Sequence, residues 1–167
     1  MIKPLRYQLT GAAWELELHP VVVEHMGSYR QTSFWKKEAG GQLYAKSLAT
    51  TQIEVSATSG PYPCDARSRH SYTMRGNAAT IDREKNFQQG YTLCGLWHTH
   101  PEPKPYPSGP DLNAVKDNLA LLPEWEALLL IIQGTLPGPN GLFVGVFHRK
   151  QGLHQMSALS DTELLMM

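Results

Sequence analysis

Two histidines and an aspartate lie close together in the sequence and have the chemistry of metal ligands. His98 and His100 are separated by a single residue, and Asp111 follows after a proline-rich segment. Residues two apart on a β-strand project to the same face, so both imidazoles are expected to point to one site. Two imidazoles and one carboxylate leave one of four tetrahedral positions open, which is typical of a catalytic rather than a structural zinc site. The spacing therefore predicts a zinc centre formed by His98, His100 and Asp111.

The elements that flank these residues can hold them in place. Residues 91–97 are apolar and β-prone, which predicts a buried strand that ends at the first histidine. The prolines that follow exclude regular structure directly after it. Residues 111–122 carry apolar side chains at helical spacing, and Ser108 and Pro110 suit the cap and first turn of a helix. Asp111 is thus expected near a helix N-terminus that faces back toward the end of the strand.

The overall composition is that of an ordinary folded protein. The chain has 167 residues, 41% of them hydrophobic and 18% charged, which predicts a single domain over residues 1–167. Basic and acidic residues number 15 each, and a neutral chain lacks the basic surface of a broad nucleic-acid binder. No apolar run approaches the ~20 residues of a membrane span, and the N-terminus lacks the apolar segment of a signal peptide. We therefore expect a cytoplasmic protein, with Cys64 and Cys94 as reduced thiols and with no nucleic-acid or membrane partner.

Apolar stretches along the rest of the chain predict an α/β protein, in which helices flank one mixed β-sheet. A helix is expected at 21–35, with Phe34 on its buried side, and another from about residue 77 to residue 88. Residues 59–68 have the composition of a loop. Strands are expected at 13–19, 42–46, 51–57, 69–75, 126–132, 142–149 and 153–159, the last two as a hairpin.

The metal-ligand segment also resembles the signature of a known family. The run H-T-H-P at 98–101, followed after six residues by S-G-P-D at 108–111, resembles the H-x-H-P-x6-S-x-x-D signature of the JAMM/MPN+ metalloproteases. That family also has an upstream glutamate before glycines and an apolar strand, and E-A-G-G at 38–41 is similar to this segment. The resemblance covers roughly residues 13–150, and the compact size is similar to the prokaryotic JAB branch.

This resemblance implies a fold, a metal and a role for each site residue. The fold would be a single JAB/MPN domain, with a mixed sheet and flanking helices in a cytidine-deaminase-like sandwich. His98, His100 and Asp111 would bind Zn²⁺. Glu38 would hold and deprotonate the attacking water, and Ser108 would hydrogen-bond the developing oxyanion or the water. No cofactor beyond the metal would be needed.

The resemblance further implies a zinc-dependent peptidase or isopeptidase. Its substrate would be the bond after the C-terminal tail of a ubiquitin-like or similarly conjugated protein, in deconjugation or in precursor processing. Bacterial members encoded beside E1-like and E2-like enzymes remove such conjugates, some of them in anti-phage operons that also encode a cyclic-nucleotide synthase. These proteins are therefore the expected partners.

Simpler explanations remain open for several of these residues. Glu38, beside two lysines, could be a solvated carboxylate, and Ser108 could act only as a helix cap. Trp97 and Tyr106 could line a substrate groove or only pack, and the five other histidines are expected to be ordinary surface or core residues. For the whole chain, the alternative is an MPN scaffold or tail-binding module without catalysis. A zinc nucleobase deaminase is set aside because its H-x-E and P-C-x-x-C ligands are absent.

Overall fold

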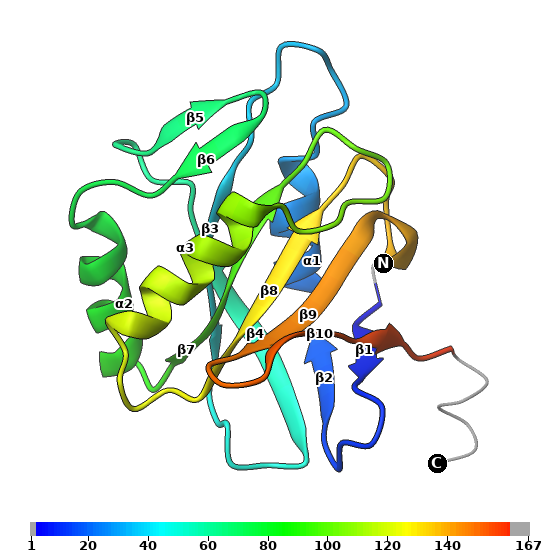
Figure 1. The fold of residues 1–167 in the computed structure, drawn as a ribbon, viewed down its shortest axis with the longest axis vertical. Helices are drawn as coiled ribbons and strands as arrows, with labels where there is room; N and C mark the ends of the chain where they lie inside the picture. The colour runs from blue at the N-terminus through cyan, green and yellow to red at the C-terminus, as the bar shows by residue number, and fades with distance from the viewer. Residues whose placement is uncertain (1–2, 161–167) are drawn as a thin grey trace.

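The structure, a computed structural model, describes residues 3–160 and is built around one large mixed β-sheet (Figure 1). Its strands are β1 Leu5–Gln8, β2 Glu15–Leu18, β3 Gly40–Ala45, β4 Gln52–Ser59, β7 Thr92–Thr99, β8 Ala127–Gln133, β9 Leu142–His148, β10 Gly152–Gln155 and β11 Ser157–Ala158. A separate hairpin consists of β5 Ala66–Ser68 and β6 Ser71–Thr73. The helices are α1 Pro20–Ser28, α2 Ala78–Gln88 and α3 Gly109–Ala120, with a short 3-10 turn at Pro139–Gly141.

The order of the nine strands is β10-β9-β8-β7-β3-β4-β2-β1-β11. The pairs β2–β4 and β7–β8 are parallel, and the other neighbouring pairs are antiparallel. The expected mixed sheet with flanking helices is therefore confirmed. β7, the strand that leads to the two histidines, lies near the middle of this order between β3 and β8.

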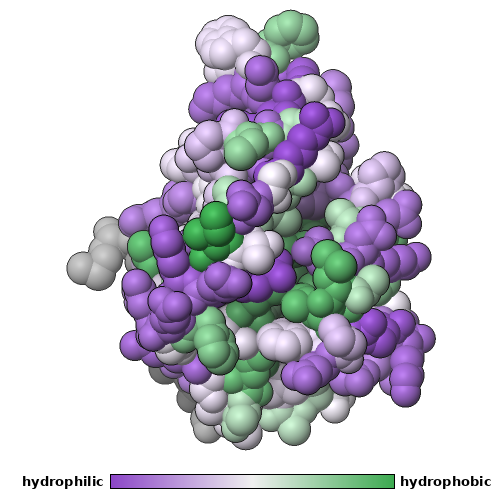
Figure 2. All heavy atoms as spheres, turned by 90° about the vertical axis from the view of Figure 1, so that its left-hand side faces the viewer, coloured by the Kyte–Doolittle hydropathy of each residue, from purple (hydrophilic) through white to green (hydrophobic). Residues whose placement is uncertain are grey.

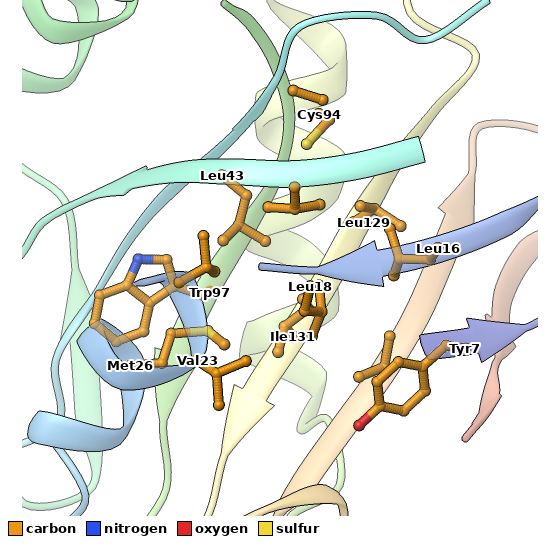
Figure 3. Packing of buried hydrophobic residues seen from close by; sticks show 14 of the residues in the cluster. Tyr7, Leu16, Leu18, Val23, Met26, Leu43, Cys94, Trp97, Leu129 and Ile131 are labelled. Carbon is orange, nitrogen blue, oxygen red and sulfur yellow. The ribbon is translucent and has the colours of Figure 1, made fainter. Parts of the chain in front are cut away.

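Helices cover both faces of the sheet and create two hydrophobic cores. On one face, Val23 and Met26 of α1 pack in a cluster with Trp97 of β7 (Figure 3). On the other face, α3 crosses the strands, and its Val115 and Leu119 pack in a second cluster (Figure 1). Within residues 3–160, no helix has the length and apolar character needed to cross a membrane.

The apolar run of β8 contributes to both cores because successive side chains of a strand point to opposite faces. Leu129 and Ile131 belong to the core beneath α1, whereas Leu128, Leu130 and Ile132 belong to the core beneath α3. All five side chains are buried. The expectation of a buried strand here is confirmed, and this strand pairs with β7.

The sheet curves so strongly that its two edges come together. β10 forms one edge and β11 forms the other, although only Met156 separates them along the chain. Met156 N–H donates to the carbonyl of Val144 at 2.9 Å, and Leu159 N–H donates to the carbonyl of Arg6 at 2.9 Å. The prediction of one strand at 153–159 was therefore wrong, because the chain leaves β9 at Met156 and pairs with β1 instead.

The first helix is shorter than its apolar residues predicted. α1 ends at Ser28, because Gly27 and Ser28 are weak helix formers and the Tyr29 N–H turns back to the carbonyl of Met26. Phe34, expected on the buried side, is 80% exposed. The prediction was thus wrong for residues 29–35, which belong to a segment without helix or strand. We name residues 29–39 the entry loop, because they lead into β3.

The small β5–β6 hairpin differs from the expected loop at 59–68 and strand at 69–75. β5 forms within the expected loop, and only Ser71–Thr73 of the expected strand has β-structure. Tyr72 fastens this hairpin to the sheet, because its hydroxyl lies 2.7 Å from Asp65 Oδ2 and 2.8 Å from the carbonyl oxygen of Gly40. The prediction failed because the two strands are only three residues long, too short for a periodic signal.

Close packing of β7 against β8 requires a glycine at position 95. A Cβ added to Gly95 would lie 2.6 Å from both Cβ and the carbonyl oxygen of Leu129. We expect Gly95→Ala to lower the free energy of unfolding by about 1–3 kcal/mol through this crowding. Gly27→Ala is the control: its Cβ would meet nothing within 4 Å, and alanine in a helix should add about 0.5–1 kcal/mol. Urea denaturation measures both, and wild-type stability of Gly95→Ala would contradict the packing.

Candidate metal centre

The two histidines lie side by side where β7 ends. The strand continues two residues beyond its expected end, so His98 pairs with Gly40 on one side and Ile132 on the other. His100 extends this pairing, since its N–H donates to the carbonyl of Gln133 at 3.0 Å. Both rings are buried, and their Nε2 atoms are 3.1 Å apart. The structure thus brings the two imidazoles together on one face of the sheet.

Asp111 reaches the histidines from the first turn of α3. Ser108 is the N-cap: its Oγ accepts the N–H of Asp111 at 3.3 Å, while Asp111 Oδ2 accepts the N–H of Ser108 at 2.7 Å. This reciprocal pair is a capping box. The same carboxylate lies 3.1 Å from His98 Nε2 through Oδ1 and 3.1 Å from His100 Nε2 through Oδ2. The cap that starts the helix therefore also holds the aspartate against the histidines.

The spacing of the three donors fits a tetrahedral metal ion. One ligand atom from each of His98, His100 and Asp111 lies within 4.8 Å of the others, and this is the only such group among residues 3–160. Ligands at ~2.0–2.1 Å from a tetrahedral zinc are about 3.3 Å from one another. The 3.1 Å between the two Nε2 atoms is close to this value. Two imidazoles and a carboxylate are also a donor set that zinc uses in catalytic sites.

The charges in this cluster favour a bound cation. Burial alone would raise the pKa of Asp111, but hydrogen bonds from His100 and His98 outweigh it and hold that pKa well below its usual range. Burial alone would lower the pKa of His100, but Asp111 and the nearby carboxylates Glu38 and Glu102 outweigh it and raise that pKa. A buried site that stabilises positive charge in this way can bind a metal ion in place of a proton.

Glu38 lies in the entry loop, two residues before β3 begins, and is only 5% exposed. Its N–H donates to the carbonyl of Ser68 at 2.7 Å, and its own carbonyl accepts from Arg67 Nε at 2.6 Å, so β5 fixes its backbone. Burial raises the pKa of its carboxyl to about 7; the charge of His100 opposes this rise, and the carboxylates of Asp111 and Glu102 add to it. The simpler explanation of a solvated carboxylate is therefore wrong. A carboxyl with a pKa near neutrality can accept a proton and return it.

One cavity of about 690 Å³ contains the whole site. It lies between α3 and the β5–β6 hairpin, which contributes residues 70–74 to the lining. The side of the molecule that carries α2 and the hairpin is mainly hydrophilic, with apolar side chains gathered in patches near its middle (Figure 2). All five residues singled out in the sequence line this cavity: Glu38, His98, His100, Ser108 and Asp111.

Other expectations near the site had mixed outcomes. Trp97 contributes to the lining but is almost entirely buried, and its ring packs edge-on against His25. Tyr106 is outside the cavity lining and packs edge-on against Phe143 at 5.3 Å between ring centroids. His70, expected to be an ordinary histidine, lines the cavity from the hairpin. No clear signal in the sequence marks this position, because the two strands that flank His70 are only three residues long.

Comparisons with known proteins agree with this architecture. The family described as prokaryotic homologs of the JAB domain matches residues 18–145. A protein of Escherichia coli (strain TW11681) named CD-NTase/cGAS isopeptidase is 33% identical over 96 residues, which cover 56% of this chain and 61% of that protein. A Vibrio cholerae protein (serotype O1, El Tor Inaba N16961) of the same name is 30% identical over 116 residues, which cover 68% of this chain and 72% of that protein.

The likeness extends to a solved structure. The solution structure of a Desulfitobacterium hafniense protein has a TM-score of 0.58 at 19% identity, covering 83% of this chain and 87% of that one. At this identity the likeness to the solved structure concerns the fold alone. The sequence match to the Escherichia coli relative spans less than two thirds of that protein. The family match covers most of the chain, including the cluster of two histidines and an aspartate. The chain therefore belongs to the prokaryotic JAB family.

Proposed function

We propose that the protein is a zinc-dependent isopeptidase or peptidase of the JAMM type, with His98, His100 and Asp111 as the metal ligands. One observation supports this proposal above all others. The three donors converge to within 4.8 Å of one another in a cavity that also contains the buried Glu38. Membership of the prokaryotic JAB family adds to the argument, and the donor set favours zinc among the common metals.

Different residues of the site carry out different steps of the proposed reaction. A bound zinc ion would polarise the scissile carbonyl and lower the pKa of a water molecule from ~15.7 toward ~7. Glu38 accepts the proton of the attacking water and returns it to the leaving amine, a task that its raised pKa suits. Ser108 Oγ accepts the N–H of Asp111 through a lone pair, so its own hydrogen is available to the developing oxyanion.

The shape of the cavity favours an extended substrate. A space of about 690 Å³ is too small for a folded domain but accommodates several residues of a tail. β6 lines this space, and in the described part of the chain it pairs only with β5, so its second edge is available to an extended peptide. We propose that the substrate is the C-terminal tail of a ubiquitin-like or similarly conjugated protein.

The relatives suggest which conjugate the protein acts on. Both carry the name CD-NTase/cGAS isopeptidase, so we propose a CD-NTase, a cyclic-nucleotide synthase, as the conjugated protein. The corresponding role is deconjugation in bacterial anti-phage defence beside E1-like and E2-like enzymes, and processing of a precursor tail would use the same chemistry. Cys64 and Cys94 are both free thiols, in keeping with the proposed cytoplasmic location.

Removal of the metal is expected to abolish activity. Zinc-loaded protein should contain about one ion per chain, and it should cleave a CD-NTase tail conjugate until a chelator strips the metal. Added zinc should restore cleavage, which gel electrophoresis and elemental analysis follow together. Cleavage that continues in the metal-free protein would contradict the mechanism. Binding of the tail without cleavage by the zinc-loaded protein would instead favour a scaffold.

Glu38→Gln is expected to lower kcat by about 10²–10⁴-fold, because an amide cannot accept the proton of the water. Bound zinc should remain, since Glu38 is outside the group of three donors. Single-turnover cleavage measures the rate of the reaction, and elemental analysis of the same sample measures the bound zinc. Glu84→Gln, which makes the same change on exposed α2, is the control and should cleave normally. Normal kcat in Glu38→Gln would remove Glu38 from the mechanism.

Ser108→Ala separates a helix cap from a catalytic donor. Loss of the cap should lower the free energy of unfolding by about 1 kcal/mol. Loss of the donor should lower kcat by about 10²–10³-fold, as for other oxyanion donors. Denaturation measures the first effect, and cleavage well below Tm measures the second. A change in stability with unchanged kcat would mean that Ser108 is only the cap.

A further inference from the structure

Thr99, the residue between the two histidines, points away from them to the opposite face of β7. Its side chain is 0% exposed. Its Oγ1 accepts the N–H of Ala39 at 3.0 Å and donates to Oε1 of Gln31 at 3.0 Å. A hydroxyl has only one hydrogen, so Thr99 Oγ1 donates to Gln31 and to no other group. Thr99 thereby holds the residue that directly follows Glu38.

Gln31 carries this connection further. The side chain is 2% exposed, and its Nε2 donates to the carbonyls of Lys36 at 3.2 Å and Arg69 at 2.8 Å. Lys36 belongs to the entry loop, and Arg69 lies in the turn of the β5–β6 hairpin. One buried amide therefore links three segments: the entry loop, the hairpin and the strand that leads to both histidines.

The hydrogen bonds of Thr99 hold residues that precede the first residue of β3. β3 begins at Gly40, so Glu38 and Ala39 lie beyond the end of the strand. Thr99 bonds both polar groups of Ala39: its N–H donates to the carbonyl at 2.8 Å, and its Oγ1 accepts the N–H. β5 holds the backbone of Glu38 itself. Thr99, with the amide of Gln31 behind it, ties the next residue to the strand that leads to the histidines.

We propose, on the basis of the proposed function, that Thr99 and Gln31 are positioning residues for Glu38. Neither side chain contacts the donor atoms of the metal site or lines the cavity. A displacement of a catalytic group by about 1 Å can cost about 10²-fold in rate. Loss of these hydrogen bonds should therefore lower kcat, whereas KM and metal content depend on other residues. If the two residues had a purely structural role, their substitution would lower the free energy of unfolding and leave kcat unchanged.

The test begins with a pair of substitutions at one position. Thr99→Val removes the hydroxyl with little change of shape, and Thr99→Ser keeps the hydroxyl. In zinc-loaded Thr99→Val, kcat for a CD-NTase tail conjugate should fall ~10- to 100-fold with little change in KM, and about one zinc per chain should remain. Thr99→Ser should recover most of the wild-type kcat, which a role of the methyl group in packing would not explain.

A second pair of variants keeps the test informative if Thr99→Val folds poorly. Gln31→Met should lower kcat as Thr99→Val does. Gln42→Met is the matched control, because Gln42 is also buried and its Nε2 donates to the carbonyl of Ala79 in α2 and to two tyrosine hydroxyls. This control should lose comparable stability while its kcat stays near the wild-type value.

Three results would overturn the positioning role. The first is a wild-type kcat in Thr99→Val or Gln31→Met. The second is an equal loss of kcat in Gln31→Met and Gln42→Met. The third is a loss of zinc that accounts for the lost activity. A failure of zinc-loaded wild-type protein to cleave any tail conjugate is a different result. It would overturn the proposed function, and the positioning role with it.

Discussion

The register of β7 against its two neighbours is the constraint on which the site depends. Gly40 on β3 and Ile132 on β8 lie opposite His98, so the histidine is held from both sides. A shift by one residue would turn every side chain of β7 to the other face, and both imidazoles would leave the cavity together. Gly40 permits this close pairing, because a Cβ there would lie 2.6 Å from the carbonyl oxygen of Trp97. Gly40, two residues after Glu38, is thus a condition of the register.

Burial of several ionisable groups in one cavity costs free energy. Hydrogen bonds that also form the helix cap and hold the hairpin offset this cost. Asp111 receives its backbone hydrogen bond from the helix cap that starts α3. The backbone of Glu38 is held by the hairpin that also lines the cavity. The carboxyl of Glu38 has a pKa raised to about 7 through burial, which is the condition for its proposed role. The geometry of the proposed site therefore depends on the same hydrogen bonds as the local folding of these segments.

The residues of the site could be predicted from sequence because their signals are local. His98 and His100 follow strand periodicity, Ser108 and Asp111 follow capping chemistry, and Glu38 followed from the resemblance to a known family. The link between Thr99 and Gln31 joins residues 68 positions apart, so no local pattern revealed it. The two-residue strand β11 was missed for the same reason, because its pairing with β1 joins distant parts of the sequence. The early end of α1 has a local cause instead, since Gly27 and Ser28 are weak helix formers.

The closure of the sheet at Met156 has a consequence for how the protein behaves in a crowded cell. Long unpaired strand edges invite aggregation, because they offer open N–H and C=O groups to other chains. Here the outermost strands are short, four residues in β10 and two in β11, and a single residue joins them. The large sheet therefore offers few unpaired N–H and C=O groups through which copies of the protein could aggregate. This protection matters most if β6 receives extended tails as proposed, because that role requires one strand edge to stay unpaired.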